Sequence, residues 1–110
     1  MLPAKNRLHN KKEFQEVLKR GAKLYGQMVM VRYIANTSDF KMGLIVSTKV
    51  AKNASDRNRI KRLIREVVRR EFLKENKFCR MVIIARKEIV DKDYDQIKME
   101  LKKILKKQGF

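Results

Sequence analysis

The segment Arg57–Arg70 constrains the fold of this chain more than any other part of the sequence. It contains seven cations and one acid in fourteen residues, yet an apolar residue recurs at every turn of a helix. At about 100° per residue the apolar side chains fall on one arc, and Asn58, Arg62, Arg65 and Arg69 fall nearly opposite. The segment therefore predicts a helix that packs on a core through one face and presents guanidinium groups on the other.

The cations of this segment favour a phosphate-rich partner. Six of the seven are arginine, whose planar guanidinium binds phosphate oxygens as a bidentate fork. A merely solvated face is the alternative, but solvated faces usually interleave acids at i±4, and this segment has only Glu66. The whole chain has 29 Lys+Arg against 12 Asp+Glu, a formal charge of +17, so we expect a polyanion. Nucleic acid is the first candidate.

An anionic membrane is the second candidate, and it is disfavoured because no apolar run approaches the ~20 residues of a membrane span. The length of 110 residues predicts a single domain, residues 1–110, and a hydrophobic content of 44% is that of a globular protein. A single cysteine and the lack of a signal-peptide-like N-terminus favour a cytoplasmic location.

The hydrophobic periodicity predicts an α+β fold, a small sheet with helices packed on it. Asn10 and Glu13 predict the N-terminus of a short helix that ends near Gly21. Strands are expected at 28–34 and 42–47, paired as a hairpin, and at 78–85, where a continuous apolar run predicts a central position. Ser55 or Asp56 is expected to cap the arginine-rich helix, and a last amphipathic helix is expected from Tyr94 to Leu105.

No set of residues predicts hydrolytic chemistry carried by the chain itself. The only histidine, His9, lies in a basic N-terminal arm. Cys79 stands at the start of an apolar strand, where we expect it to be a small buried hydrophobic residue. The triplet Asp91, Asp93, Asp95 resembles the start of a calcium loop but lacks the glycine and the final glutamate, so it is interpreted as helix-start acids. We therefore predict no catalytic residue and no metal site.

The run Arg57-Asn58-Arg59-Ile60-Lys61-Arg62-Leu63-Ile64-Arg65-Glu66 resembles the RNR signature of the bacterial ribonuclease P protein family. Three other segments agree in order along the chain: Asn6-Arg7-Leu8, Gly43-Leu44-Ile45-Val46-Ser47 and Ile83-Ile84-Ala85-Arg86. The resemblance implies a small two-layer α/β sandwich, about αβββαβα, with a left-handed crossover between parallel strands. The general rule for such crossovers predicts the right-handed form instead.

The resemblance also implies a function, as the protein subunit of a ribonucleoprotein endoribonuclease. In such an enzyme a catalytic RNA removes the 5′ leader of precursor tRNA with Mg²⁺ that the RNA holds, and the protein binds the RNA subunit and the leader. The helix would dock on the catalytic RNA through Arg57, Asn58, Arg59, Lys61, Arg62, Arg65 and Arg69. A leader cleft between the first helix and the sheet would be lined by Phe14, Leu18, Val29, Val31, Tyr33, Lys49 and Ala85.

Two of these cleft positions, Leu18 and Val31, carry aliphatic residues where the family often has aromatic ones, and Tyr33 is a candidate substitute ring. No protein partner is predicted. The alternative function is a structural RNA-binding protein of the ribosomal type, which the charge and fold class equally allow and which needs no substrate cleft. A stand-alone nuclease is the third function, and incubation of the chain alone with Mg²⁺ and precursor tRNA would test it.

Overall fold

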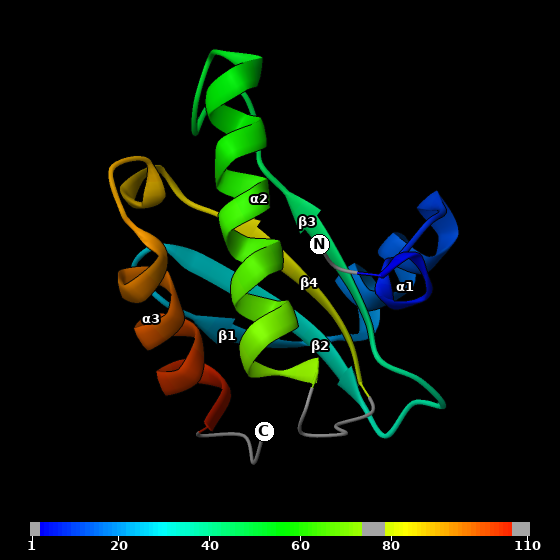
Figure 1. The fold of residues 1–110 in the computed structure, drawn as a ribbon. Coiled ribbons are helices and arrows are strands. Elements are labelled where there is room, and N and C mark those ends of the chain that lie inside the picture. The colour runs from blue at the N-terminus through cyan, green and yellow to red at the C-terminus, as the bar shows by residue number, and fades with distance from the viewer. Residues whose placement is uncertain (1–2, 74–78, 107–110) are drawn as a thin grey trace.

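The computed structural model describes residues 3–73 and 79–106 (Figure 1). The helices are α1 (Lys11–Arg20), α2 (Ala54–Glu71) and α3 (Tyr94–Lys106), and the strands are β1 (Ala22–Tyr25), β2 (Val29–Ala35), β3 (Lys41–Ile45) and β4 (Cys79–Ala85). Short 3-10 turns lie at Ala4–Asn6 (η1) and Lys87–Ile89 (η3). The order αβββαβα is the order that the family resemblance implies, and the α+β class is confirmed.

The four strands form one sheet in the order β1-β2-β4-β3. β2 is antiparallel to β1 and β4, whereas β3 is parallel to β4. The central position predicted for 78–85 is confirmed for residues 79–85, while Phe78 lies outside the described residues. The predicted hairpin between the second and third strands is wrong because β4, apolar on both faces, inserts between them.

The connection from β3 through α2 to β4 is left-handed. Both strands run upward in Figure 1, α2 lies in front of the sheet, and β4 lies to the left of β3. A right-handed crossover would place β4 on the other side. The structure thus agrees with the family resemblance against the general rule.

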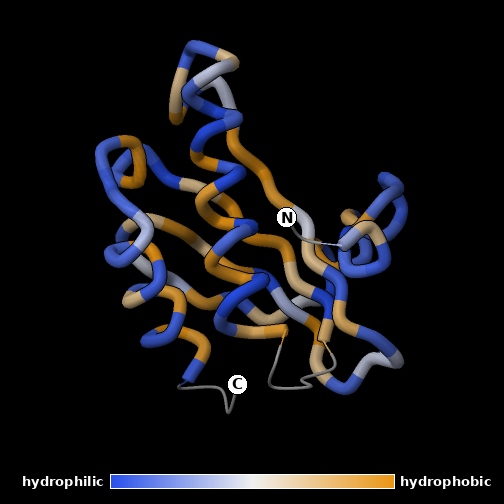
Figure 2. The backbone as a smooth tube through the Cα atoms, in the orientation of Figure 1, coloured by the Kyte–Doolittle hydropathy of each residue, from blue (hydrophilic) through white to orange (hydrophobic). Residues whose placement is uncertain are grey.

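The core of the protein lies between the sheet and the layer formed by α2 and α3. Ile60, Ile64, Val67 and Val68 of α2 are buried there, as the sequence predicts, and the buried residues of α3 join them: Ile97, Leu101, Ile104 and Leu105. Figure 2 shows hydrophobic and hydrophilic residues alternating along α2. Helix α1 packs on the opposite face of the sheet, where Val17 and Val82 are buried with Leu8 in a smaller cluster.

The helices α1 and α2 differ in how their N-termini are capped. The side chain of Asn10 accepts from the backbone N–H of Glu13 at 2.8 Å, so the predicted cap of α1 is confirmed. The cap of α2 is Asn53, not Ser55 or Asp56, and its side chain caps no backbone N–H. Gly21 ends α1 with an extended backbone, and a Cβ there would overlap the carbonyl oxygen of Val17.

The turn between β1 and β2 is held by a carboxylate from α3. Glu100 accepts hydrogen bonds from the backbone N–H groups of Gln27, Met28 and Val29 at 2.7, 2.8 and 3.1 Å. A Cβ at Gly26 would lie 2.8 Å from this carboxylate, so a larger residue there would displace the Glu100 side chain from the turn. The contact ties the free edge of the sheet to the last helix.

We expect Glu100→Ala to lower the free energy of unfolding by ~1–3 kcal/mol, because it removes charged hydrogen bonds from partly buried N–H groups. Urea denaturation of the variant and the wild type measures the change. Lys103→Ala is the matched control, because this residue lies on the same helix and lines the same pocket without contacting the turn. Equal, small losses for both variants would contradict the assignment.

Candidate nucleic-acid interface

The outer side of α2 forms a pocket of about 430 Å³ lined by Asn58, Arg62, Arg65 and Glu66. The predicted row Asn58, Arg62, Arg65 is therefore brought together on one side of the helix. Arg62 and Arg65 make no hydrogen bond or ion pair with any residue that the structure describes. Their guanidinium groups remain available for an external acceptor.

Arg65 lies where positive charge is concentrated by the fold. Burial, and then the charge of Arg7 from the N-terminal arm, lower the pKa of the Arg65 guanidinium below its ordinary value. The arm reaches this position because Arg7 bridges to Met42 and the N–H of Leu8 donates to the carbonyl of Met42 at 3.1 Å. Since two guanidinium groups repel each other there, a bound anion would relieve the repulsion.

Two further arginines at the start of α2 are fixed by backbone carbonyls. Arg57 donates to the carbonyl oxygens of Ala51 and Lys52 at 2.9 and 2.7 Å. Arg59 donates to that of Val90 at 2.6 Å. These bonds orient the guanidinium groups but leave their charges uncompensated, so they add to the positive potential of the N-terminal half of α2.

The C-terminal end of α2 is more nearly neutral. Glu66 accepts from Arg69, and Arg70 lies 3.3 Å from the same carboxylate. The hydrogen bond from Arg69 lowers the pKa of Glu66, which therefore stays ionised. Arg70 also stacks over the ring of Tyr94 at 5.5 Å. The sequence assigned Arg69 to the RNA-binding row, but in the structure its guanidinium is already paired with Glu66.

The sheet surface that α1 contacts is a second candidate surface, which we call the α1 face. Phe14 and Leu18 are partly buried there, as are Ile45 of β3 and Ile84 of β4, and all four pack against the small cluster that contains Val17. Phe14 packs on Gly43, where a Cβ would overlap its ring. Because strand residues alternate between faces, Met30 and Arg32 of β2 share this side of the sheet.

Four residues assigned to the cleft lie on the other face of the sheet, and their assignment is wrong. Val29, Val31 and Ala85 are buried in the main core beneath α2 and α3, and Tyr33 packs against the same core. The error is one of register, since a shift of one residue moves every side chain to the opposite face. Lys49 is exposed in the loop between β3 and α2, which also binds Arg57.

One sequence signal distinguished the two faces of β2. Arg32 interrupts the apolar run of β2, and a charged side chain marks the less covered face of a strand. Its guanidinium donates to the carbonyl of Gly21 at 3.1 Å and is partly buried. The residues that sequence reasoning missed on this face are therefore Met30, Arg32 and Ile84.

The residues considered for catalysis are each in a position that a structural role explains. His9 is exposed, with its ring nitrogen 2.6 Å from the carbonyl oxygen of Ala4. Cys79 is buried, and burial raises the pKa of its thiol to about 12. Asp93 caps α3 by exchanging hydrogen bonds with Gln96 at 3.0 Å in both directions. Among the described residues no three His, Cys, Asp or Glu side chains gather as metal ligands.

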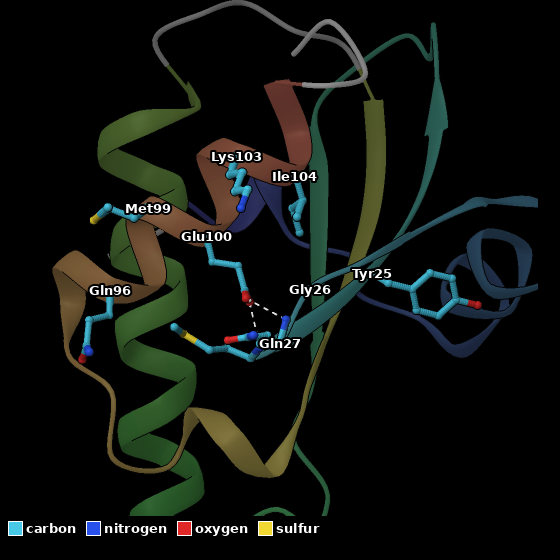
Figure 3. A pocket seen from close by; sticks show the side chains of 9 residues that line it. Tyr25, Gly26, Gln27, Gln96, Met99, Glu100, Lys103 and Ile104 are labelled. Carbon is cyan, nitrogen blue, oxygen red and sulfur yellow. Dashed lines mark hydrogen bonds between the residues drawn. The ribbon is translucent and has the colours of Figure 1, made fainter.

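A further pocket of about 550 Å³ lies between α3 and the turn after β1 (Figure 3). Its only carboxylate, Glu100, is fully engaged by the backbone of that turn. The pocket therefore offers no free carboxylate for acid–base chemistry.

The described helices include none long and apolar enough to cross a membrane. A cationic outer face on α2, a partly apolar surface on the opposite side of the sheet and a small basic α+β scaffold are together typical of the class of RNA-binding proteins. Comparison with known proteins makes the family specific.

Residues 2–109 match the family model described as Ribonuclease P, and the chain therefore belongs to the ribonuclease P protein family. It is 40% identical over 107 residues to the ribonuclease P protein component of Clostridium botulinum (strain Loch Maree / Type A3), covering 94% of this chain and 95% of that protein. The corresponding protein of Bacillus pumilus is 34% identical over 107 residues, covering 96% and 89%.

Solved structures agree with this family. The RNase P protein of Staphylococcus aureus superposes with a TM-score of 0.80 at 29% identity, covering 94% of each chain. That of Thermotoga maritima gives a TM-score of 0.79 at 29% identity, covering 92% of this chain and 96% of the other. The family is that of the protein component of an RNA-based endoribonuclease that processes tRNA, and the ribosomal-type alternative is not favoured.

Proposed function

We propose that this protein binds the catalytic RNA through the outer side of α2 and the 5′ leader of precursor tRNA through the α1 face. The observation that carries the first assignment is the pocket lined by Asn58, Arg62, Arg65 and Glu66, where the charge of Arg7 acts on Arg65. Two unpaired guanidinium groups at fixed positions suit the phosphates of a folded RNA, whose shape is recognised mainly through its backbone.

The second assignment is supported by the composition of the α1 face. Phe14, Leu18, Ile84 and Met30 are partly buried apolar side chains on a protein of net charge +17. Unstacked bases of single-stranded RNA bury their faces on such side chains, while nearby cations meet the phosphates. Lys49 and Arg57, in and beside the loop after β3, are the cations that we assign to this role.

In this proposal the hydrolysis of the phosphodiester belongs to the RNA subunit and its Mg²⁺. The chain binds and orients: α2 fixes the protein on the catalytic RNA, and the α1 face fixes the leader relative to it. Binding energy gained at the leader then raises the affinity for precursor over mature tRNA, which lacks the leader. We further propose that the protein acts in the cytoplasm, where precursor tRNA is made.

We expect Phe14→Ala to weaken binding of precursor tRNA to the reconstituted holoenzyme by ~1–3 kcal/mol, the contribution of one aromatic–base stack. Binding of mature tRNA and of the catalytic RNA should scarcely change. Val17→Ala is the matched control, because Val17 lies on the same helix but is 1% exposed, inside the small cluster. It should lower stability without changing the preference for the leader.

Affinity for precursor tRNA, mature tRNA and catalytic RNA, measured for both variants together with their melting temperatures, decides the matter. A Phe14→Ala protein that melts at a much lower temperature and binds all three RNAs less tightly would assign Phe14 to the core alone. Undiminished binding of precursor tRNA by a folded Phe14→Ala protein would remove α1 from the leader surface.

A further inference from the structure

Tyr25, the last residue of β1, is exposed beside the α1 face. It is 64% exposed and is one of only two large hydrophobic residues exposed among those described, with Met99. In Figure 3 its ring projects away from Glu100 and Lys103 of the nearby pocket. Isolated apolar side chains on a surface are common, so exposure alone carries no function. The position of Tyr25 in the sheet is more informative.

The strand register makes Tyr25 the end of an apolar row. Tyr25 pairs with Met30, Met30 pairs with Ile84, and Ile84 pairs with Ile45. Ile84 and Ile45 pack against the same small cluster, Leu8, Val17 and Val82, as Phe14 and Leu18 of α1 do, so the whole row lies on the α1 face. With neighbouring strands ~4.8 Å apart, the row extends ~14 Å from beneath α1 to the free edge of the sheet.

Cations accompany the row at its Tyr25 end. Lys23, two residues before Tyr25 on the same face of β1, is exposed. Arg86 follows β4, and its guanidinium donates to the carbonyl of Gly26, the residue after Tyr25, at 3.2 Å. Arg86 also lies 3.7 Å from Glu88, but both side chains are about half exposed, and such a pair contributes little.

The opposite end of the α1 face is neutralised. Lys41 lies 3.2 Å from Glu13, and Arg80 lies 3.3 Å from Asp39. Burial opposes ionisation of Glu13, but the hydrogen bond and charge of Lys41 prevail and lower its pKa, so the carboxylate is charged. A polyanion on this face is therefore drawn toward the Tyr25 end and away from the acids.

We propose that Tyr25 is a stacking platform for a base of single-stranded RNA, which extends the leader surface from α1 to the β1 edge. The inference rests on the proposed leader surface and adds a residue to it. A ring that is open on one face, at the end of an apolar row and between two cations, fits an unpaired base flanked by phosphates. A folded RNA helix would instead present phosphates and sugars, which need no aromatic ring.

The test uses the holoenzyme reconstituted with a bacterial catalytic RNA and precursor tRNAs whose leaders lengthen by single nucleotides. For long leaders we expect Tyr25→Ala to weaken binding about fivefold to tenfold, the lower part of the range for a base–aromatic stack. Tyr25→Phe, which keeps the ring, should bind as the wild type does. Met99→Ala removes the other exposed hydrophobic residue, on α3, and should have no effect.

Leader length separates this inference from the proposed function. Because Tyr25 and Phe14 lie at opposite ends of the row, their alanine variants should begin to lose affinity at different leader lengths. A 2-aminopurine base at the Tyr25-dependent position should be quenched by the wild type and by Tyr25→Phe, and not by Tyr25→Ala.

If Phe14→Ala loses leader-dependent affinity and Tyr25→Ala loses none at any length, the leader surface stands and the role of Tyr25 is wrong. If neither variant loses leader-dependent affinity, the leader surface itself fails. A loss for Tyr25→Ala that is equal for mature tRNA, precursor tRNA and the catalytic RNA alone would place Tyr25 against folded RNA and overturn the inference.

Discussion

The double reversal Arg62→Glu with Arg65→Glu is expected to weaken assembly with the catalytic RNA at least tenfold while leaving the fold intact. Both side chains point away from the apolar arc of α2 and make no ion pair with a described residue. Each substitution replaces a phosphate contact by repulsion, so the loss exceeds that of a simple truncation.

The position of Arg65 allows the effects on stability and on RNA affinity to be predicted separately. Arg65 lies near Arg7, and no described acid pairs with either Arg62 or Arg65. Arg65→Glu would place a carboxylate beside Arg7 and so turn a repulsion inside the folded chain into an attraction. Stability should therefore be unchanged or slightly raised, whereas RNA affinity falls.

The control is a double reversal with the same change of net charge at another site, Lys103→Glu with Lys106→Glu on α3. Binding to the catalytic RNA, circular dichroism and melting temperature are measured for both proteins. The interface assignment is wrong if the α2 variant keeps its secondary structure and binds as tightly as the wild type. It also fails if the α3 variant loses as much affinity, because net charge would then explain the effect.

The features predicted correctly from the sequence are those set by strong local patterns. The apolar arc of α2 is buried and β4 is central in the sheet, as predicted. Each pattern is compatible with only one arrangement that buries its apolar side chains. The cap at Asn10 was recognisable because capping depends on residues within one turn.

The features that escaped prediction depend on partners distant in the sequence. The bond between Glu100 and Met28 joins residues separated by 72 positions, and nothing local indicates it.

Strand β1 was missed for a different reason. It has four residues, of which only Leu24 is not largely exposed, and these are too few to show a clear alternation of apolar and polar residues.

The faces of β2 were only weakly distinguished by its own residues, because both sides carry apolar side chains and Arg32 was the one sign of the less covered face. Only helix placement decides between Val31 and Met30, and the left-handed crossover that sets it contradicts the usual rule. The sequence therefore predicted the arrangement of Asn58, Arg62 and Arg65 on α2, which one helix determines. It misplaced four side chains relative to the α1 face, where three elements meet.

Binding of the catalytic RNA is expected to weaken steeply with salt. If about five to seven cations each meet a phosphate, the plot of log affinity against log salt has a slope of about −4 to −6, at ~0.7–0.9 per phosphate. Between about 50 and 200 mM salt the affinity then falls about 10³-fold. The candidate cations lie along α2: Lys61, Arg62, Arg65 and Arg69, with Arg59 held in place by a carbonyl.

The slope also tests which cations are used. Each arginine that truly meets a phosphate contributes ~0.7–0.9, so truncating both Arg62 and Arg65 to alanine should make the slope shallower by about 1.5. Truncating Arg69 and Arg70, which Glu66 already neutralises in part, should change it less. A wild-type slope shallower than about −2 would mean that the charge of +17 serves something other than phosphate binding. Equal slopes for both truncated pairs would mean that RNA docks along the whole helix, with the Glu66 pairs broken on binding.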